Sequence, residues 1–230
     1  MERLMRNVVR GGVMVLCVVG LTGCFSTYTW HQKMTVEVEA DGQLYAGSSV
    51  VQVSATQNPD FLPVSNARDV DFRGEAVVLK LPENQYLFTL LTNAINLAPK
   101  VFEAELRKAR KEPGQWWLQV LSDLRKTRNI APKDYPLLVT FTDITDPKTV
   151  QEVDPENLNV MFGPGVWLKR ITLEITDEPV TEGKIESVLG WWCDLRKKRA
   201  RLNGSTSIGI SDNELSNNLG TGSFRIGDCT

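Results

Sequence analysis

The chain has 230 residues, of which 42% are hydrophobic and 23% are charged, and its formal net charge is −2. This composition is that of an ordinary globular protein, and about 200 residues bury enough surface to fold without a metal or a disulfide. The acidic balance excludes a general nucleic-acid-binding surface, because such a surface must be basic to displace counterions from phosphates.

A secretory leader is predicted at the N-terminus. Arg3, Arg6 and Arg10 precede an uncharged, largely apolar run over residues 11–20, and small residues follow it. This order is typical of a signal peptide, and the run is shorter than the roughly 20 apolar residues of a membrane-spanning helix. We predict that residues 1–23 are removed. That loss leaves a mature chain with a net charge of about −4, since the leader carries +2.

The leader ends on Leu21, Thr22, Gly23 and Cys24, which resemble the lipobox of bacterial lipoproteins. The resemblance implies that the signal peptidase recognises the first three of these residues and that Cys24 carries acyl chains. Each buried methylene contributes about 0.8 kcal/mol, so two or three chains anchor a protein firmly. We therefore expect the membrane to be the main partner of the protein, bound through the acyl chains on Cys24.

The expected location is the bacterial cell envelope, with the protein lipid-anchored and facing the periplasm. Residue 25 is Phe rather than Asp, which favours the outer over the inner membrane by analogy with proteobacterial sorting. Residues 24–33 are expected to form a lipidated tether.

Antiparallel strands are predicted in several parts of the mature chain. Asp41-Gly42 lies between two runs of small and β-branched residues and indicates a hairpin turn. Pro82, Glu83 and Asn84 indicate a second turn, whereas residues 57–73 have no clear period and predict a loop. The expected strands are residues 35–38, 46–53, 75–81, 86–91, 137–141 and 167–176.

Helices are predicted where apolar residues recur with a period of 3.6. One helical region spans residues 100–128 and is divided by Pro113-Gly114, and another spans residues 182–202, weakened by Gly190. Asp146-Pro147 and Asp154-Pro155 each place a capping acceptor before a proline, which predicts two short helices or helical turns.

These elements predict the α+β class, with a mainly antiparallel sheet, two or three helices on one face and a cleaved signal peptide before it. Residues 34–202 are expected to form a single α+β domain. Residues 203–230 are rich in Gly, Ser and Asn, and we expect them to be poorly ordered or at most an added hairpin.

Two cysteines, Cys193 and Cys229, remain in the mature chain besides Cys24. In an oxidising compartment they can pair and close a loop of about 36 residues. Alternatively, Cys193 is half-buried and Cys229 is free in a mobile tail. The sequence favours neither, because it does not give the distance between them.

Several short runs in residues 30–192 together resemble a group of uncharacterised lipoproteins from alphaproteobacteria that share a domain of unknown function. The resemblance implies no reaction. The runs are Gly47-Ser48-Ser49-Val50-Val51, Gly74-Glu75-Ala76-Val77, Asp146-Pro147, Val153-Asp154-Pro155, Phe162-Gly163, Gly165-Val166, Leu168, Arg170 and residues 176–181.

No catalytic constellation is evident. His31 is the only histidine, so a nucleophile–histidine pair would have to use it, and zinc sites with several histidines are excluded. A tether or strand role is the simpler interpretation. Glu75 and Glu178 are one arbitrary choice of acid pair for glycosidic chemistry. The acids that can gather oxygens for a hard cation are Asp143, Asp146, Asp154, Asp177 and Glu178, but their spacing is not that of a calcium loop.

Two tryptophan pairs are unusual, Trp116-Trp117 and Trp191-Trp192. Neighbours on a helix point in different directions, so one ring of each pair can form an interaction surface, for which tryptophan is favoured. Core packing is the alternative. A basic run at residues 196–201 follows the second pair and suits either anionic headgroups or a solvated helix end.

The sequence therefore predicts a membrane-anchored envelope lipoprotein that binds an unknown envelope protein or polymer, without catalysis, metal or cofactor. The alternative is an envelope-associated hydrolase that uses carboxylates.

Overall fold

A long antiparallel hairpin organises the fold. The computed structural model describes residues 26–57, 70–109, 117–207, 214–227 and 229. Strands β1 (Ser26–Ala40) and β2 (Gln43–Gln57) have 15 residues each and pair along their whole length. At about 3.3 Å per residue, each strand is roughly 50 Å long. Asp41 and Gly42 connect them with φ values of 50° and 76°, as a two-residue hairpin turn requires, and this predicted turn is confirmed.

Four more strands extend the hairpin to a six-stranded antiparallel sheet in the order β10-β3-β2-β1-β9-β6. They are β3 (Val70–Glu75), β6 (Thr127–Asn129), β9 (Val166–Thr176) and β10 (Arg225–Ile226). Along β1 the buried side chains alternate with half-exposed ones from Trp30 to Ala40. Only one face of this sheet is therefore packed against the core.

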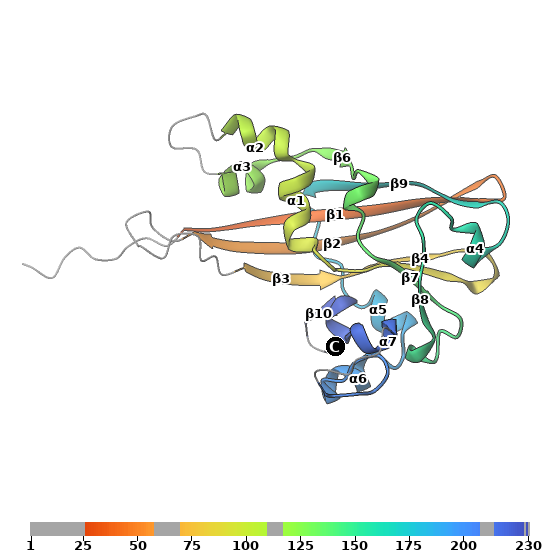
Figure 1. Ribbon diagram of the computed structural model, residues 1–230. Helices are drawn as coiled ribbons and strands as arrows, with labels where there is room; N and C mark the ends of the chain where they lie inside the picture. The colour runs from red at the N-terminus through yellow and green to blue at the C-terminus, as the bar shows by residue number, and fades with distance from the viewer. Residues whose placement is uncertain (1–25, 58–69, 110–116, 208–213, 228, 230) are drawn as a thin grey trace, which may run out of the picture.

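The second sheet has four antiparallel strands in the order β4-β5-β7-β8. They are β4 (Val77–Lys80), β5 (Tyr86–Thr89), β7 (Leu138–Phe141) and β8 (Val150–Glu152). Leu87 belongs to the core shared with the large sheet, whereas its neighbour Phe88 belongs to a second core with the C-terminal residues. Successive residues of a strand face opposite sides, so the small sheet is the middle layer of the molecule (Figure 1).

Three helices cover the remaining part of the packed face, near the start of β1 (Figure 1). Their buried residues, among them Leu97, Phe102 and Leu121, join Trp30 and Val36 in the first core. The helices are α1 (Ala94–Val101), α2 (Glu103–Ala109) and α3 (Trp117–Asp123), and a short α4 (Asn159–Phe162) lies before β9.

The C-terminal part of the chain completes the second core. It contributes α5 (Lys184–Val188), α6 (Trp192–Lys198) and α7 (Leu215–Asn218). Within the described residues, four single-turn 3-10 helices complete the secondary structure, at Pro82–Asn84, Pro132–Asp134, Pro147–Thr149 and Thr221–Ser223.

The α+β prediction is confirmed, with two antiparallel sheets instead of one. Strands lie in each of the six ranges expected to form them. Asp146 caps the helical turn at Pro147–Thr149 through a bond from the Lys148 backbone N–H. Asp154 instead accepts from the Glu156 backbone N–H in a turn that is not helical.

Two expected boundaries differ from the structure. Residues 26–33, expected in the tether, belong to β1, where Trp30 is 4% exposed and anchors the strand in the core. Described residues of the expected tail are packed, since Leu219 and Phe224 are buried in the second core. The tail has few apolar side chains, but they cover the apolar face of the small sheet that includes Phe88 and Val139.

Candidate functional site

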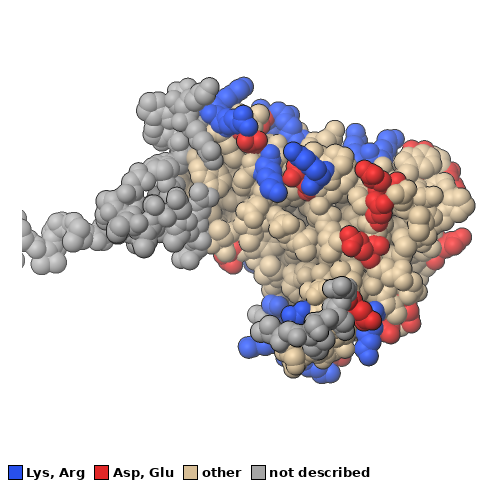
Figure 2. Space-filling model, in the orientation of Figure 1, with Lys and Arg blue, Asp and Glu red and all other residues tan. Residues whose placement is uncertain are grey.

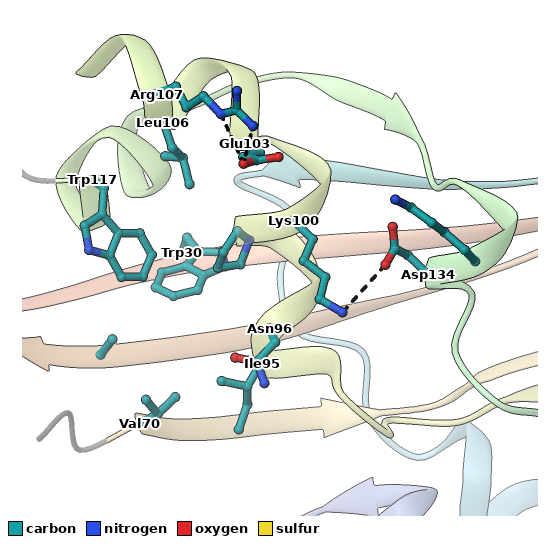
Figure 3. Close-up of a pocket in the computed structure, with 13 residues that line it drawn as sticks. Trp30, Val70, Ile95, Asn96, Lys100, Glu103, Leu106, Arg107, Trp117 and Asp134 are labelled. Carbon is teal, nitrogen blue, oxygen red and sulfur yellow. Dashed lines mark hydrogen bonds and ion pairs between the residues drawn. The ribbon is translucent and has the colours of Figure 1, made fainter. Parts of the chain in front are cut away.

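A groove of about 890 Å³ lies between the helices α1–α3 and the sheet (Figure 3). Its floor comes from three neighbouring strands, through Trp30 of β1, Ala55 of β2 and Val70 of β3. Ala55 is paired with Tyr28 on one side and with Val70 on the other. The register therefore places the groove at the end of the sheet where β1 begins.

Hydrogen bonds fix the floor of the groove. The Trp30 indole N–H donates to Gln32 Oε1 over 3.2 Å, and Gln32 Nε2 donates to the carbonyl oxygen of Ala94 over 2.9 Å. Gln32 is 2% exposed, so its amide is bonded where water does not reach. This chain of bonds joins β1 to the first residue of α1 and holds the helix over the sheet.

The walls of the groove are largely apolar. Trp117 lies beside Trp30 with Leu106 above both, and Ile95 points toward Val70 on the other side (Figure 3). Ile95 is 39% and Val70 36% exposed, although residues of this type are usually buried. The groove thus offers apolar surface that the described residues do not cover.

Paired charges surround the groove. Lys100 Nζ lies 3.6 Å from Asp134 Oδ1, and the Arg107 guanidinium lies 2.7 Å from Glu103 Oε1, one helical turn away (Figure 3). Two of the three lining cations face a carboxylate, and the third is Lys133, so the rim carries both signs of charge and does not select strongly for either. The described lining residues include no Ser, Thr, Cys, His or Tyr, and what they offer a ligand is apolar contact and exposed ion pairs.

Of the four predicted surface tryptophans, the structure places Trp117 in this groove, buries Trp192 and leaves Trp191 partly buried. Trp192 is fully buried and donates to the carbonyl oxygen of Thr221 over 3.0 Å. Trp191 donates to the carbonyl oxygen of Ile144 and meets Phe141 and Phe224 edge to face. The surface interpretation of Trp192 is therefore wrong. That of Trp191, which is partly buried against the second core, stays a prediction, and Trp116 lies outside the described residues.

Sequence reasoning missed an exposed tryptophan at the opposite end of the sheet. Trp167 is 48% and Leu44 50% exposed, and both are paired with Glu39 of the central strand β1. Simple alternation gives no such signal, because Trp167 lies an even number of residues from the buried Ile171 and Leu173 and would share their inward phase. The register shift at Glu37 and Val38 reverses that phase and turns Trp167 outward. Trp30 was also overlooked, since it was assigned to the tether.

His31 and the two acids after β9 form an exposed network. His31 Nδ1 lies 2.7 Å from the carbonyl oxygen of Glu178, and Lys33 Nζ lies 2.6 Å from the Glu178 carboxylate. Hydrogen bonds from the Arg125 guanidinium lower the pKa of Asp177. These groups fasten the segment after β9 to the outer face of β1, where no nucleophile accompanies the histidine among the described contacts.

The acids considered as cation ligands each bond to a different neighbour and do not form one site among the described residues. A hydrogen bond from the Thr145 hydroxyl lowers the pKa of Asp143, and one from the Asn157 amide lowers the pKa of Asp154. In the part of the chain that the structure describes, the one cluster with metal-ligand spacing is Glu186, Cys193 and Cys229, and its two cysteines are joined to each other.

Glu75 and Glu178, considered as a hydrolase pair, have different roles. Glu75 is fully buried, and its two carboxylate oxygens accept hydrogen bonds from the backbone N–H groups of Lys184 and Ile185 over 3.1 and 3.2 Å. It caps α5 from inside the protein, whereas Glu178 lies exposed against Lys33.

Cys193 and Cys229 form a disulfide with their Cα atoms 5.7 Å apart, a usual separation for such a bond. The predicted lipidation site Cys24 and its recognition residues Leu21, Thr22 and Gly23 lie outside the described residues.

No described helix combines the length and the hydropathy that a membrane crossing requires. No protein-family model, curated protein or solved structure matches this chain.

Proposed function

We propose that the protein is a lipid-anchored lipoprotein of the bacterial cell envelope that binds another envelope protein without catalysing a reaction. The observation that carries the proposal is the position of the groove. Its floor residue Trp30 lies four residues into β1, and β1 begins at Ser26, two residues after the predicted lipid site Cys24.

This spacing leaves almost no tether. Two residues span at most about 7 Å of extended chain, so a lipid on Cys24 holds the Ser26 end of the sheet against the bilayer surface. The groove at that end then opens close to the membrane. The periplasmic side of the outer membrane is the proposed location, because Phe25 follows the lipid site.

The partner is proposed to be a protein segment with apolar side chains. Ile95, Val70 and Trp117 present apolar surface, and the rim carries charges of both signs in pairs. Such a site suits a side-chain anchor inserted into a pocket with a polar rim. A strongly anionic polymer gains little from it, because Asp134 and Glu103 neutralise two of the three lining cations and leave only Lys133 without a carboxylate within ion-pair distance among the described residues.

The anchor is tested by mass spectrometry of the native protein and of a Cys24→Ser chain. The expected native N-terminus is an acylated Cys24, and the variant should be released from membranes by a salt wash. An unmodified residue 24 or a retained leader in the native protein would refute the anchor. Separation of inner and outer membranes on a density gradient tests the location.

The groove is tested by placing a charge on its wall. Ile95→Asp should abolish co-purification of a detergent-extracted envelope partner, because the new carboxylate must be desolvated on binding. Val160→Asp is the matched control, since Val160 is 75% exposed and does not line the groove. Equal capture of the partner by both variants would contradict this site. Loss of capture on substitution of Trp167, at the far end of the sheet, would contradict it as well.

A further inference from the structure

A second hollow, of about 650 Å³, lies between the end of α6 and the turn formed by residues 220–222. Four cationic residues line it, and none of its described lining residues is Asp or Glu. We call it the basic hollow. Its cations are Arg196, Lys197, Arg199 and Arg201. Figure 2 shows Lys and Arg side chains along the lower edge of the molecule, where Figure 1 places α6.

The cations of the basic hollow have no acidic partner among the described residues. Other cations, such as Lys80 and Lys148, also lack an ion pair, but they do not line this hollow. Ten ion pairs join the described residues, and their cations lie at positions such as Lys33, Lys100 and Arg170 but never in residues 196–201. Arg201 donates to the carbonyl oxygen of Asn217, which leaves its positive charge without a counterion among the described residues.

The end of the helix does not neutralise this charge. A helix C-terminus carries roughly half a negative elementary charge, and α6 has only seven residues. Four positive charges exceed that value several-fold. The protein as a whole is acidic, so the basic hollow runs against the average charge of the molecule.

The walls of the basic hollow are fixed to each other. The Trp192 indole donates to the Thr221 carbonyl oxygen over 3.0 Å, and the Leu202 backbone N–H donates to the Leu219 carbonyl oxygen over 3.0 Å. The Cys193–Cys229 disulfide joins α6 to the last residues. A site held in this way loses little entropy when a ligand binds.

The position of Arg199 adds an independent observation. It ends α6 with φ 53° and ψ 34°, a left-handed conformation that usually belongs to glycine at this position. An arginine there carries a backbone cost that glycine avoids, while its side chain reaches the basic hollow.

We propose that the basic hollow binds a phosphate-bearing ligand. Guanidinium groups donate paired hydrogen bonds to phosphate oxygens, and lysine adds a point charge. Gly220 and Gly222 on the facing wall have no side chains to keep a ligand at a distance. The phosphate can belong to a lipid headgroup or to a soluble molecule, and the inference does not depend on the lipid anchor or on the groove.

The test uses a double variant that the fold tolerates, Arg196→Gln with Arg199→Gly, in the full chain. Glycine suits the backbone of residue 199, so the variant should remain folded by circular dichroism. The matched control is Lys169→Gln with Arg170→Gln on β9, which removes the same charge at exposed positions.

Two probes distinguish the sources of phosphate. Calorimetry measures binding of pyrophosphate at low salt. Flotation measures binding of a Cys24→Ser chain to phosphatidylcholine vesicles with and without phosphatidylglycerol. We expect the double variant to weaken at least one of these interactions by about tenfold or more, and salt to weaken binding by the parent chain.

Pyrophosphate binding alone would assign a soluble phosphate, and binding only to vesicles that contain phosphatidylglycerol would assign a lipid headgroup. Failure of the parent chain to bind either probe would overturn the proposal. An equal loss in the double variant and the β9 control would overturn it as well, because net charge rather than the basic hollow would then explain binding.

Discussion

The buried carboxylate of Glu75 accepts a hydrogen bond from the Ile185 backbone N–H, so the last residue of β3 caps a helix that begins 109 residues further along the chain. Glu75→Ala should lower the free energy of unfolding by about 1 to 3 kcal/mol, since two buried donors lose their acceptor. Glu75→Gln should cost less because one amide oxygen remains. Urea denaturation measures both, and equal losses would contradict the capping role.

Gly47 allows the two sheets to approach each other. A Cβ at this position would lie 2.8 Å from the Val78 carbonyl oxygen and 3.1 Å from the Leu79 Cβ. Gly47→Ala should therefore lower the free energy of unfolding by about 1 to 3 kcal/mol through overpacking. Gly190→Ala, where nothing lies within 4 Å of the added atom, should change it by less than about 0.5 kcal/mol. Similar thermal midpoints for the two variants would argue against the close contact.

The disulfide fastens the C-terminal residues to α6 and joins two cysteines that are 36 positions apart, Cys193 and Cys229. Reduction should lower the free energy of unfolding by about 3 to 4 kcal/mol if the loss of loop constraint in the unfolded chain dominates. The urea midpoint with and without reductant measures this change. A Cys193→Ser, Cys229→Ser double variant should match the reduced protein and ignore reductant, and a reductant effect on it would point to another cause.

Glu105 provides a pH-dependent contribution to stability. Burial raises the pKa of its carboxyl, but hydrogen bonds from its own backbone and from Lys126 and the charge of Arg128 outweigh this effect and lower the pKa below its ordinary value of 4.5. The ionised form therefore stabilises the fold above that value, and the contribution is lost as the pH falls through the lower folded value.

Glu105→Gln should remove this dependence and lower the free energy of unfolding at pH 7 by about 1 kcal/mol or less, because its cationic partners are half-exposed. Thermal melts between pH 7 and pH 3 measure the change. Glu103→Gln is the control, since its pair with Arg107 is exposed on both sides. If the Glu105→Gln variant loses stability with falling pH as steeply as the parent chain, Glu105 is not the source of the pH dependence.

The strands were predictable because their signals are local. Asp41-Gly42 dictates the hairpin turn, and the alternation of apolar residues along β9 follows from one packed face. The groove is different. It depends on Ala55 lying between Tyr28 and Val70, a register that no single segment contains.

The helices were less predictable where tertiary packing overrides the period. The region expected to be one helix over residues 182–202 is broken between Val188 and Trp192. A continuous helix would turn Trp191 and Trp192 about 100° apart, whereas the break lets Trp192 enter the second core and Trp191 pack against it. Likewise, residues 127–129 leave the expected helical region and pair with β9 as an edge strand.

Phe224 closes the second core long after the last strand of the small sheet, β8, which ends at Glu152. It meets Phe88 and Phe141 edge to face or tilted, and its carbonyl oxygen accepts a hydrogen bond from the Ala76 backbone N–H. The small sheet therefore cannot finish folding during synthesis until the segment that carries Phe224 has followed it. A product truncated upstream of Phe224 would leave aromatic side chains of this core exposed to water, and cellular proteases and chaperones would meet it as an incomplete protein.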